Sequence, residues 1–290
     1  MPLVRESFLA PPEAGILSRE TKTTNDKERN PMEPTAENIQ QLVKDLGNED
    51  AGAAYKAEHI LSTMAAHAAD PDKGDERAAV AAALAAELIA ETEYKDRDKT
   101  RTRPTHSARA RRHVARCLSL VGGDKEVDAL AKAMEDFDVR DMARFALERN
   151  PTAATTAALI TAVDHVGTDF RVGVVNALGR CHCEASMNAL RSLTSDADGE
   201  VRLAAAEALA GFAEPTHDAI IAGAAKADAP RAEARAAKAR IRLAETLRNA
   251  GEQAAATRIY NTMKQSNKVA PAQRKAAELA LNPKASNTVA

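Results

Sequence analysis

An arginine recurs at a fixed interval in the middle of this chain of 290 residues. Arg140, Arg171 and Arg202 lie 31 residues apart, and the positions three, six and seven residues after each of them carry small or apolar side chains. These positions hold Ala143, Ala146, Leu147, Val174, Ala177, Leu178, Ala205, Ala208 and Leu209. A constant period of this length is typical of stacked helical repeats, in which each unit buries its apolar face against its neighbours.

The composition indicates that the repeated units are helices. The chain contains 65 alanines, five phenylalanines, three tyrosines and no tryptophan. Alanine is the strongest helix former, whereas strands favour β-branched and aromatic residues. We therefore expect an all-α fold.

The repeat extends beyond the three arginines. A further unit begins at Arg111, 29 residues before Arg140, and each of the four units places an apolar residue 19 positions after its arginine. These residues are Leu130, Leu159, Leu190 and Ile221. Two helices in about 30 residues predict a right-handed α-solenoid built from helical hairpins.

The segment Asp196-Ala197-Asp198-Gly199-Glu200-Val201-Arg202, continued by Ala208-Leu209, follows the pattern Asp-x-Asp-x-x-Val-Arg-x-x-Ala-x-x-Ala-Leu-Gly nearly in full. Because of this motif, residues 107–245 resemble the short HEAT-like repeats of the phycobilin-lyase type. The resemblance implies that the recurring aspartates and arginines lie at turns between repeats and hydrogen-bond across them. It assigns a structural ladder to Arg140, Arg171, Asp198 and Arg202, and it leaves function open, because this repeat serves enzymes, scaffolds and regulators alike.

Composition and helix signals divide the chain into six parts. We expect a disordered N-terminal tail at 1–35, degenerate helical repeats at 36–92, a basic linker at 93–106, the HEAT-like array at 107–245, a tetratricopeptide-like helical cap at 246–283 and a tail at 284–290. Thr35 is the predicted N-cap of the first helix, and 271–281 is predicted as the last helix. Met32, at the end of the polar tail, is a hypothetical alternative start of translation.

The sequence predicts no metal and no cofactor. Cys181, His182, Cys183 and Glu184 are consecutive, and four adjacent side chains cannot easily surround one ion, so we interpret them as a turn between two helices. Cys117 occupies an inward position and is expected in the core. The HEAT-like deoxyhypusine hydroxylases hold iron with His-Glu pairs, and this chain has no His-Glu dipeptide.

The net charge of −2 argues against wholesale binding of nucleic acid or membranes. The cysteines and the terminus predict a cytoplasmic protein: no apolar run is long enough to cross a membrane, and the first residues lack the apolar core of a secretory signal. Three cysteines cannot form a disulfide framework, which favours a reducing compartment.

The leading prediction is a non-catalytic scaffold that binds a protein or peptide on its concave face. The second helix of each unit should line that face at positions 17 and 21 after the arginine. The candidate binding residues are Asp128, Lys132, Thr161, Asn188 and Ser192, together with the small residues Ala157, Ala219 and Gly223.

Two alternatives remain. The segment 95–116 has an excess of seven positive charges and could bind nucleic acid or an acidic partner, although no aromatic residue for stacking lies within it. Its candidate residues are Arg101, Arg103, Arg109, Arg111, Arg112 and Arg116. The other alternative is an enzyme of the phycobilin-lyase type, for which the array offers few aromatic walls.

Overall fold

The computed structural model describes residues 32–97 and 99–282. Contacts divide the chain into Met1–Glu33 and Pro34–Ala290, and the account below concerns the second unit. The tails expected at 1–35 and 284–290 lie outside the described residues, apart from positions 32–35.

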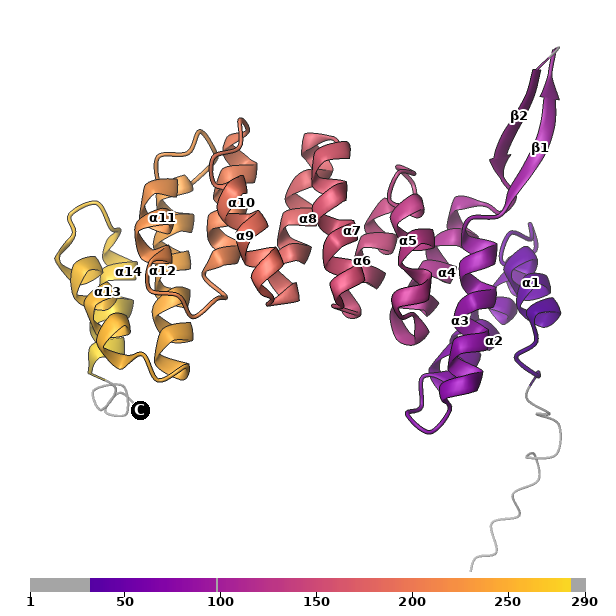
Figure 1. The fold of residues 1–290 in the computed structure, drawn as a ribbon, viewed down its shortest axis with the longest axis horizontal. Helices are drawn as coiled ribbons and strands as arrows, with labels where there is room; N and C mark the ends of the chain where they lie inside the picture. Colours follow the sequence, from indigo (N-terminus) through magenta and orange to yellow (C-terminus); the bar gives the residue numbers. More distant parts are fainter. Residues whose placement is uncertain (1–31, 98, 283–290) are drawn as a thin grey trace, which may run out of the picture. The chain divides into compact units, whose positions relative to one another are not determined.

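Helices make up most of the second unit (Figure 1). In chain order, the elements are α1 (Ala36–Asp45), α2 (Ala51–Ala68), α3 (Gly74–Leu88), β1 (Glu91–Asp96), β2 (Lys99–Pro104), α4 (Ala108–Val121), the 3-10 turn η1 (Asp124–Glu126), α5 (Val127–Ala133), α6 (Arg140–Arg149), α7 (Ala153–His165), α8 (Thr168–Cys181), α9 (Glu184–Leu193), α10 (Gly199–Leu209), α11 (His217–Ala224), α12 (Ala232–Asn249), α13 (Gln253–Gln265) and α14 (Pro271–Leu281).

The helices from α4 to α12 alternate between two layers. The first helices of the units pack in succession, α4 on α6, α6 on α8, α8 on α10 and α10 on α12. The second helices form the other layer, in which α5 packs on α7 and α7 on α9. This is the predicted all-α solenoid of helical hairpins.

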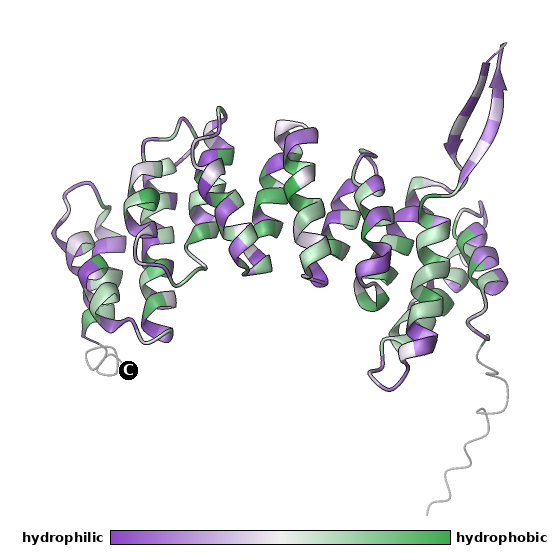
Figure 2. Cartoon of the chain, viewed as in Figure 1, coloured by the Kyte–Doolittle hydropathy of each residue, from purple (hydrophilic) through white to green (hydrophobic). Residues whose placement is uncertain are grey.

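The predicted apolar positions form the core. The residues 3, 6 and 7 positions after Arg140, Arg171 and Arg202 are all buried, as are the four residues at position 19. Figure 2 shows apolar residues concentrated where neighbouring helices face each other. Because many of these residues are alanines, the helices approach closely: a Cβ on Gly179 of α8 would lie 2.8 Å from the Cβ of Ala208 on α10.

Polar side chains set the starts of several helices. Thr35 accepts a hydrogen bond from the amide of Asn38, which confirms the predicted N-cap of α1. Ser107, Thr152 and Asp198 act in the same way at α4, α7 and α10. A side-chain acceptor at this position satisfies an amide that has no partner inside the helix.

The C-terminal helices cover the end of the array. Leu247 of α12 and Ala256 and Tyr260 of α13 are buried where these two helices pack together. Gly251 has a φ of 90°, which permits the tight turn between α12 and α13. The last helix, α14, spans the predicted residues 271–281 and packs on α13.

The segment expected as a linker at 93–106 is instead largely a β-hairpin. Strands β1 and β2 pair antiparallel from Glu91 opposite Pro104 to Asp96 opposite Lys99. This hairpin was not predicted from the sequence because both faces of the ribbon are polar. The two strands therefore lack the alternation of apolar and polar residues that indicates a strand. The threonines and Tyr94 nonetheless favour extended backbone.

Within the part of the chain that the structure describes, no helix combines the length and apolar character needed to cross a membrane.

Candidate functional site: a groove on the second-helix layer

Three of the five predicted binding residues line one groove. Asp128 and Lys132 lie on α5 and Thr161 lies on α7, and all three are exposed. Asn188 and Ser192, on α9, are also exposed but lie outside this groove. The small residues Ala157, Ala219 and Gly223 are exposed on the same layer of helices.

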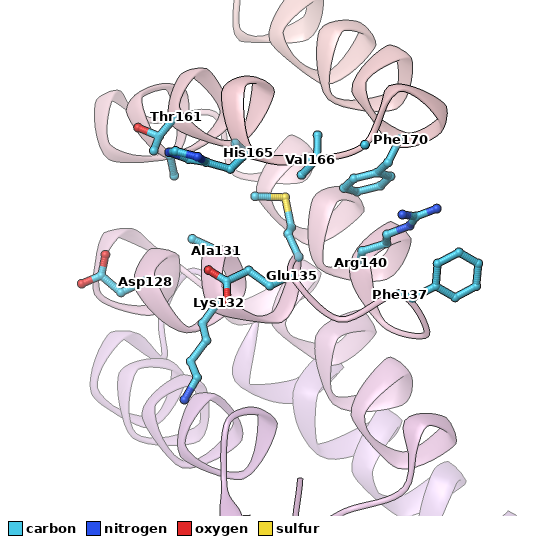
Figure 3. A pocket seen from close by; sticks show the side chains of 14 residues that line it. Asp128, Ala131, Lys132, Glu135, Phe137, Arg140, Thr161, His165, Val166 and Phe170 are labelled. Carbon is cyan, nitrogen blue, oxygen red and sulfur yellow. The ribbon is translucent and has the colours of Figure 1, made fainter. Parts of the chain in front are cut away.

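The groove lies between the α5–α6 and α7–α8 hairpins and has a volume of about 580 Å³. Small side chains, among them Ala131, Ala158 and Ala162, line it, so the two helices leave open space between them. Figure 3 shows Thr161 and His165 on one side and Asp128 and Ala131 on the other. The groove is therefore open and shallow, and both polar and apolar side chains line it.

An arginine held between two aromatic rings forms one end of the groove. The guanidinium carbon of Arg140 lies 4.4 Å from the ring centre of Phe137 and 4.8 Å from that of Phe170. The Phe170 side chain is buried, whereas Phe137 is 73% exposed. Such cation–π contacts hold the guanidinium in place and leave one face of Phe137 available to solvent.

A second depression adjoins the groove. It has a volume of about 280 Å³, and it shares Lys132 and Glu135 with the first. Lys132 Nζ lies 2.8 Å from Glu91 Oε1 at the base of the β-hairpin. This hydrogen bond lowers the pKa of the Glu91 carboxyl from its ordinary value. The ammonium group of Lys132 is therefore engaged by the hairpin, away from Thr161 and His165 (Figure 3).

The sequence interpretation missed four residues that line the groove: Glu135, Phe137, His165 and Phe170. They lie in or beside the connections between helices, outside the positions 17 and 21 that the repeat numbering singled out. Phe137 could have been identified from the sequence as an exposed residue. It lies between Asp136 and Asp138 in an inter-repeat turn, where a large apolar side chain has no core to enter.

The recurring arginines form ion pairs from one repeat to the next. Arg111 Nη2 lies 2.8 Å from Asp136 Oδ2, Arg140 Nη2 lies 2.6 Å from Asp169 Oδ2, and Arg171 Nη2 lies 2.5 Å from Asp196 Oδ2. Asp136 and Asp196 lie in the turns before α6 and α10, and Asp169 lies in the first turn of α8, so each aspartate stands at the start of the next unit. The arginines thus connect consecutive hairpins.

The last arginine of the series differs. Arg202 donates to the carbonyl oxygens of Asp196 and Ala197 in its own turn. In the same turn, Asp198 accepts hydrogen bonds from the amides of Glu200 and Val201 at the start of α10.

Acid is expected to weaken this ladder of Arg–Asp ion pairs between repeats. Burial opposes ionisation of Asp136, but hydrogen bonds from Arg111 and the Asp138 amide outweigh it, so the Asp136 pKa lies below its ordinary value of 3.8. The hydrogen bond from Arg140 lowers the pKa of Asp169 in the same way. A lowered folded-state pKa contributes stability that is present above the unfolded value and is lost as the pH falls through the folded value. The midpoint of urea unfolding, followed by circular dichroism, should therefore fall as the pH drops from about 5 to about 2.5.

The Arg140→Met variant is the matched comparison for this experiment. It removes the partner of Asp169, so its midpoint should depend less on pH than that of the wild type across the same window. Identical pH dependence in the two proteins would contradict a contribution of this ion pair to stability.

The predicted basic patch is divided between two elements. Arg101 and Arg103 lie on the β-hairpin, and Arg109, Arg111, Arg112 and Arg116 lie on α4. Arg111 is only 7% exposed and pairs with Asp136, so it belongs to the ladder and not to a surface patch. Arg109 pairs with Glu58 at 3.5 Å, and Arg112 donates to the carbonyl of Asp138.

The cysteine cluster is a turn between α8 and α9. Cys181 ends α8, His182 adopts a left-handed conformation with a φ of 47°, and Cys183 precedes α9. Cys117 is buried in the core, and burial raises the pKa of its thiol to about 12. Among the described residues, no three His, Cys, Asp or Glu side chains are grouped so that they could hold a metal ion.

The two layers of stacked hairpins define the chain as an all-α solenoid. Residues 156–241, from α7 into α12, match the family described as HEAT repeats, so this part of the chain consists of HEAT-like repeats. A search of curated proteins gives no match to this sequence.

Solved structures with helical-repeat folds resemble the chain at low sequence identity. An engineered protein is 17% identical over 83% of this chain and 66% of its own length, slightly less than two thirds, with a TM-score of 0.39. The complex of CpcE and CpcF of phycocyanin lyase from Nostoc sp. PCC7120 is 21% identical over 83% of this chain and 92% of that chain, with a TM-score of 0.40. Human deoxyhypusine hydroxylase in complex with glycerol is 16% identical over 85% and 94%, with a TM-score of 0.32. These TM-scores are low, so the three likenesses say nothing about what this chain binds or catalyses.

Proposed function

We propose that this protein is a non-catalytic scaffold that binds a segment of a protein partner in the groove between α5 and α7. The observation that supports this most is the combination of an open groove of about 580 Å³ with the exposed ring of Phe137 at its end. Exposed aromatic side chains beside a groove act as anchors for peptides and helices, because they bury much area with little loss of side-chain freedom.

The charges of the groove favour a partner with a basic residue. Lys132 is paired with Glu91, and Arg140 is paired with Asp169. Asp128 and Glu135, by contrast, are exposed and take part in no ion pair among the described residues. The groove therefore presents net negative charge, and a segment with an apolar side chain for Phe137 and a neighbouring Lys or Arg would complement it.

The test introduces a bulky side chain into the groove. Thr161→Arg should sharply reduce recovery of the partner, because the new side chain fills the space between α5 and α7 and the exposed Thr161 makes no core contact. Partner proteins captured by the immobilised full chain would be quantified by mass spectrometry for the wild type and for the variant.

Asn176→Arg is the matched control, because Asn176 is exposed on α8, in the first-helix layer. It should recover the same proteins as the wild type. Equal recovery by all three chains, or equal loss in both variants, would contradict binding in the groove.

A further inference from the structure

The β-hairpin is a surface element that the solenoid does not need for its core. Every described residue of β1 and β2 is exposed except Asp96, which is partly exposed, and the ribbon projects from the helices (Figure 1). Its base is held by the Thr105 amide bonding to the Ala90 carbonyl, by the Thr92 and Thr105 hydroxyls, and by the Glu91–Lys132 pair. A two-stranded ribbon is marginally stable in water, so this one contributes exposed surface and little stability.

The strand register places most of the positively charged side chains of the hairpin on one face. Residues opposite each other in an antiparallel pair share a face, and alternate residues of a strand share that face too. The pairs Thr92–Arg103, Tyr94–Arg101 and Asp96–Lys99 therefore lie on one face. All three cations of β2 are on this face, which we call the basic face, with only one carboxylate.

The opposite face has a different character. It carries Glu91, Glu93, Lys95, Thr100 and Thr102. Its two carboxylates and one ammonium group make it slightly acidic. The positive charge of the hairpin is thus concentrated on one side, and Figure 2 shows the ribbon to be mostly hydrophilic.

An aromatic ring lies among the cations of the basic face. Tyr94 is 39% exposed, and the guanidinium carbon of Arg103 lies 5.6 Å from its ring centre. On the same face, Arg101 pairs with Asp96 at 3.1 Å. The sequence segment 95–116 contains no aromatic residue, but the strand register brings Tyr94, one position before it, into the middle of the row of cations.

We propose that the basic face of the hairpin, made by Tyr94, Lys99, Arg101 and Arg103, binds single-stranded nucleic acid. Successive cations on this face are about 6.6–6.8 Å apart along the strand, in a row that can follow a phosphate backbone. The Tyr94 ring and the Arg103 guanidinium offer flat surfaces on which an unpaired base stacks. This stacking surface favours nucleic acid over an acidic polypeptide, and it favours a single strand over a duplex, whose bases are already stacked.

This activity is separate from the proposed binding of a protein segment. The basic face and the groove share no residue, and the Glu91–Lys132 pair that links them lies at the base of the hairpin. Either surface can therefore be altered without changing the other.

The experiment measures binding of a fluorescein-labelled single-stranded oligonucleotide of about 20 nucleotides to the full chain by fluorescence anisotropy. Three phosphate contacts on a single strand predict a slope of about −2 for the logarithm of the binding constant against the logarithm of salt concentration. Arg101→Ala and Lys99→Ala should each make the slope less steep by about 0.7. Tyr94→Leu should weaken binding at least about fivefold, while Tyr94→Phe, which keeps the ring, should bind as the wild type does.

Lys95→Ala is the matched control, since it removes a cation of the same hairpin from the opposite face. It should change the slope less than Arg101→Ala does. All of these side chains are exposed, so the helical circular dichroism signal should be unchanged in every variant.

Several results would overturn the proposal. These are the absence of salt-dependent binding, equal effects of Lys95→Ala and Arg101→Ala, and retention of full affinity by Tyr94→Leu. Tighter binding of a duplex of the same sequence would assign the face to double-stranded nucleic acid instead. Tighter binding of polyglutamate would assign it to an acidic protein.

Discussion

Replacement of Gly199 by alanine is expected to destabilise the array by about 3 kcal/mol, although it adds a single methyl group. Gly199 is the first residue of α10, and the backbone of Asp228 in the α11–α12 connection lies directly against its Cα. A Cβ built at Gly199 would lie 2.6 Å from the carbonyl carbon of Asp228 and closer still to its oxygen. Because these are backbone atoms, no side-chain rotation can relieve the contact, and two consecutive repeats must move apart.

The matched control is Gly223→Ala on α11. Apart from its chain neighbours and the backbone of its own helix, no described residue has an atom within 4 Å of a Cβ at this position, and Gly223 is exposed. Here the same substitution should stabilise the protein by about 0.5 kcal/mol, because alanine has the higher helix propensity. Urea unfolding followed at 222 nm would measure both free energies of unfolding. A loss of less than about 1 kcal/mol in the Gly199 variant would show that the α11–α12 connection can shift without cost.

The second large effect is expected for Asp218→Ala, which should cost about 3 kcal/mol. Asp218 of α11 accepts two hydrogen bonds from Arg240 of α12, at 2.6 Å from Nε and 3.0 Å from Nη2. Arg240 is only 8% exposed. Removal of the carboxylate leaves a buried guanidinium without its partner, and burying an unpaired charge is more costly than losing the attraction itself.

A double-mutant cycle distinguishes this cause from a simple loss of packing. Arg240→Met removes the charge and keeps an apolar chain of similar length, so it should cost less than Asp218→Ala. In the Arg240→Met background, Asp218→Ala should cost less than about 1 kcal/mol. If the two substitutions were additive, the stabilising role of this ion pair would be refuted.

The candidate groove could be predicted in part. The repeat numbering placed Asp128, Lys132 and Thr161 on exposed helical positions, and the structure brings all three to one groove. The repeat numbering did not predict the ion pair between Lys132 and Glu91, because that contact depends on where the hairpin begins. It also missed Phe137 and Glu135, which lie in a turn whose path depends on how α5 and α6 pack.

In the basic segment 95–116, sequence proximity grouped residues that the structure separates. Sequence proximity grouped Arg101, Arg103 and Arg111 into one patch. Arg111, however, enters the space between α4 and the Asp136 turn, whereas Arg101 and Arg103 lie on a ribbon. Neighbouring residues share a surface only when the backbone places them on the same face, and in a strand that face changes at every residue.

The sequence by itself determined the helical hairpins, their period and the residues of the core, because burial of an apolar helix face leaves a regular pattern that can be read without coordinates. It also indicated, through the 31-residue interval of Arg140, Arg171 and Arg202, that these arginines belong to the fold. Only the tertiary structure decided which aspartate each arginine meets, why Gly199 cannot carry a side chain, and that Tyr94 lies among the cations of β2. These features depend on distances between atoms of different repeats or strands, and such distances follow from packing and register, which local sequence does not encode.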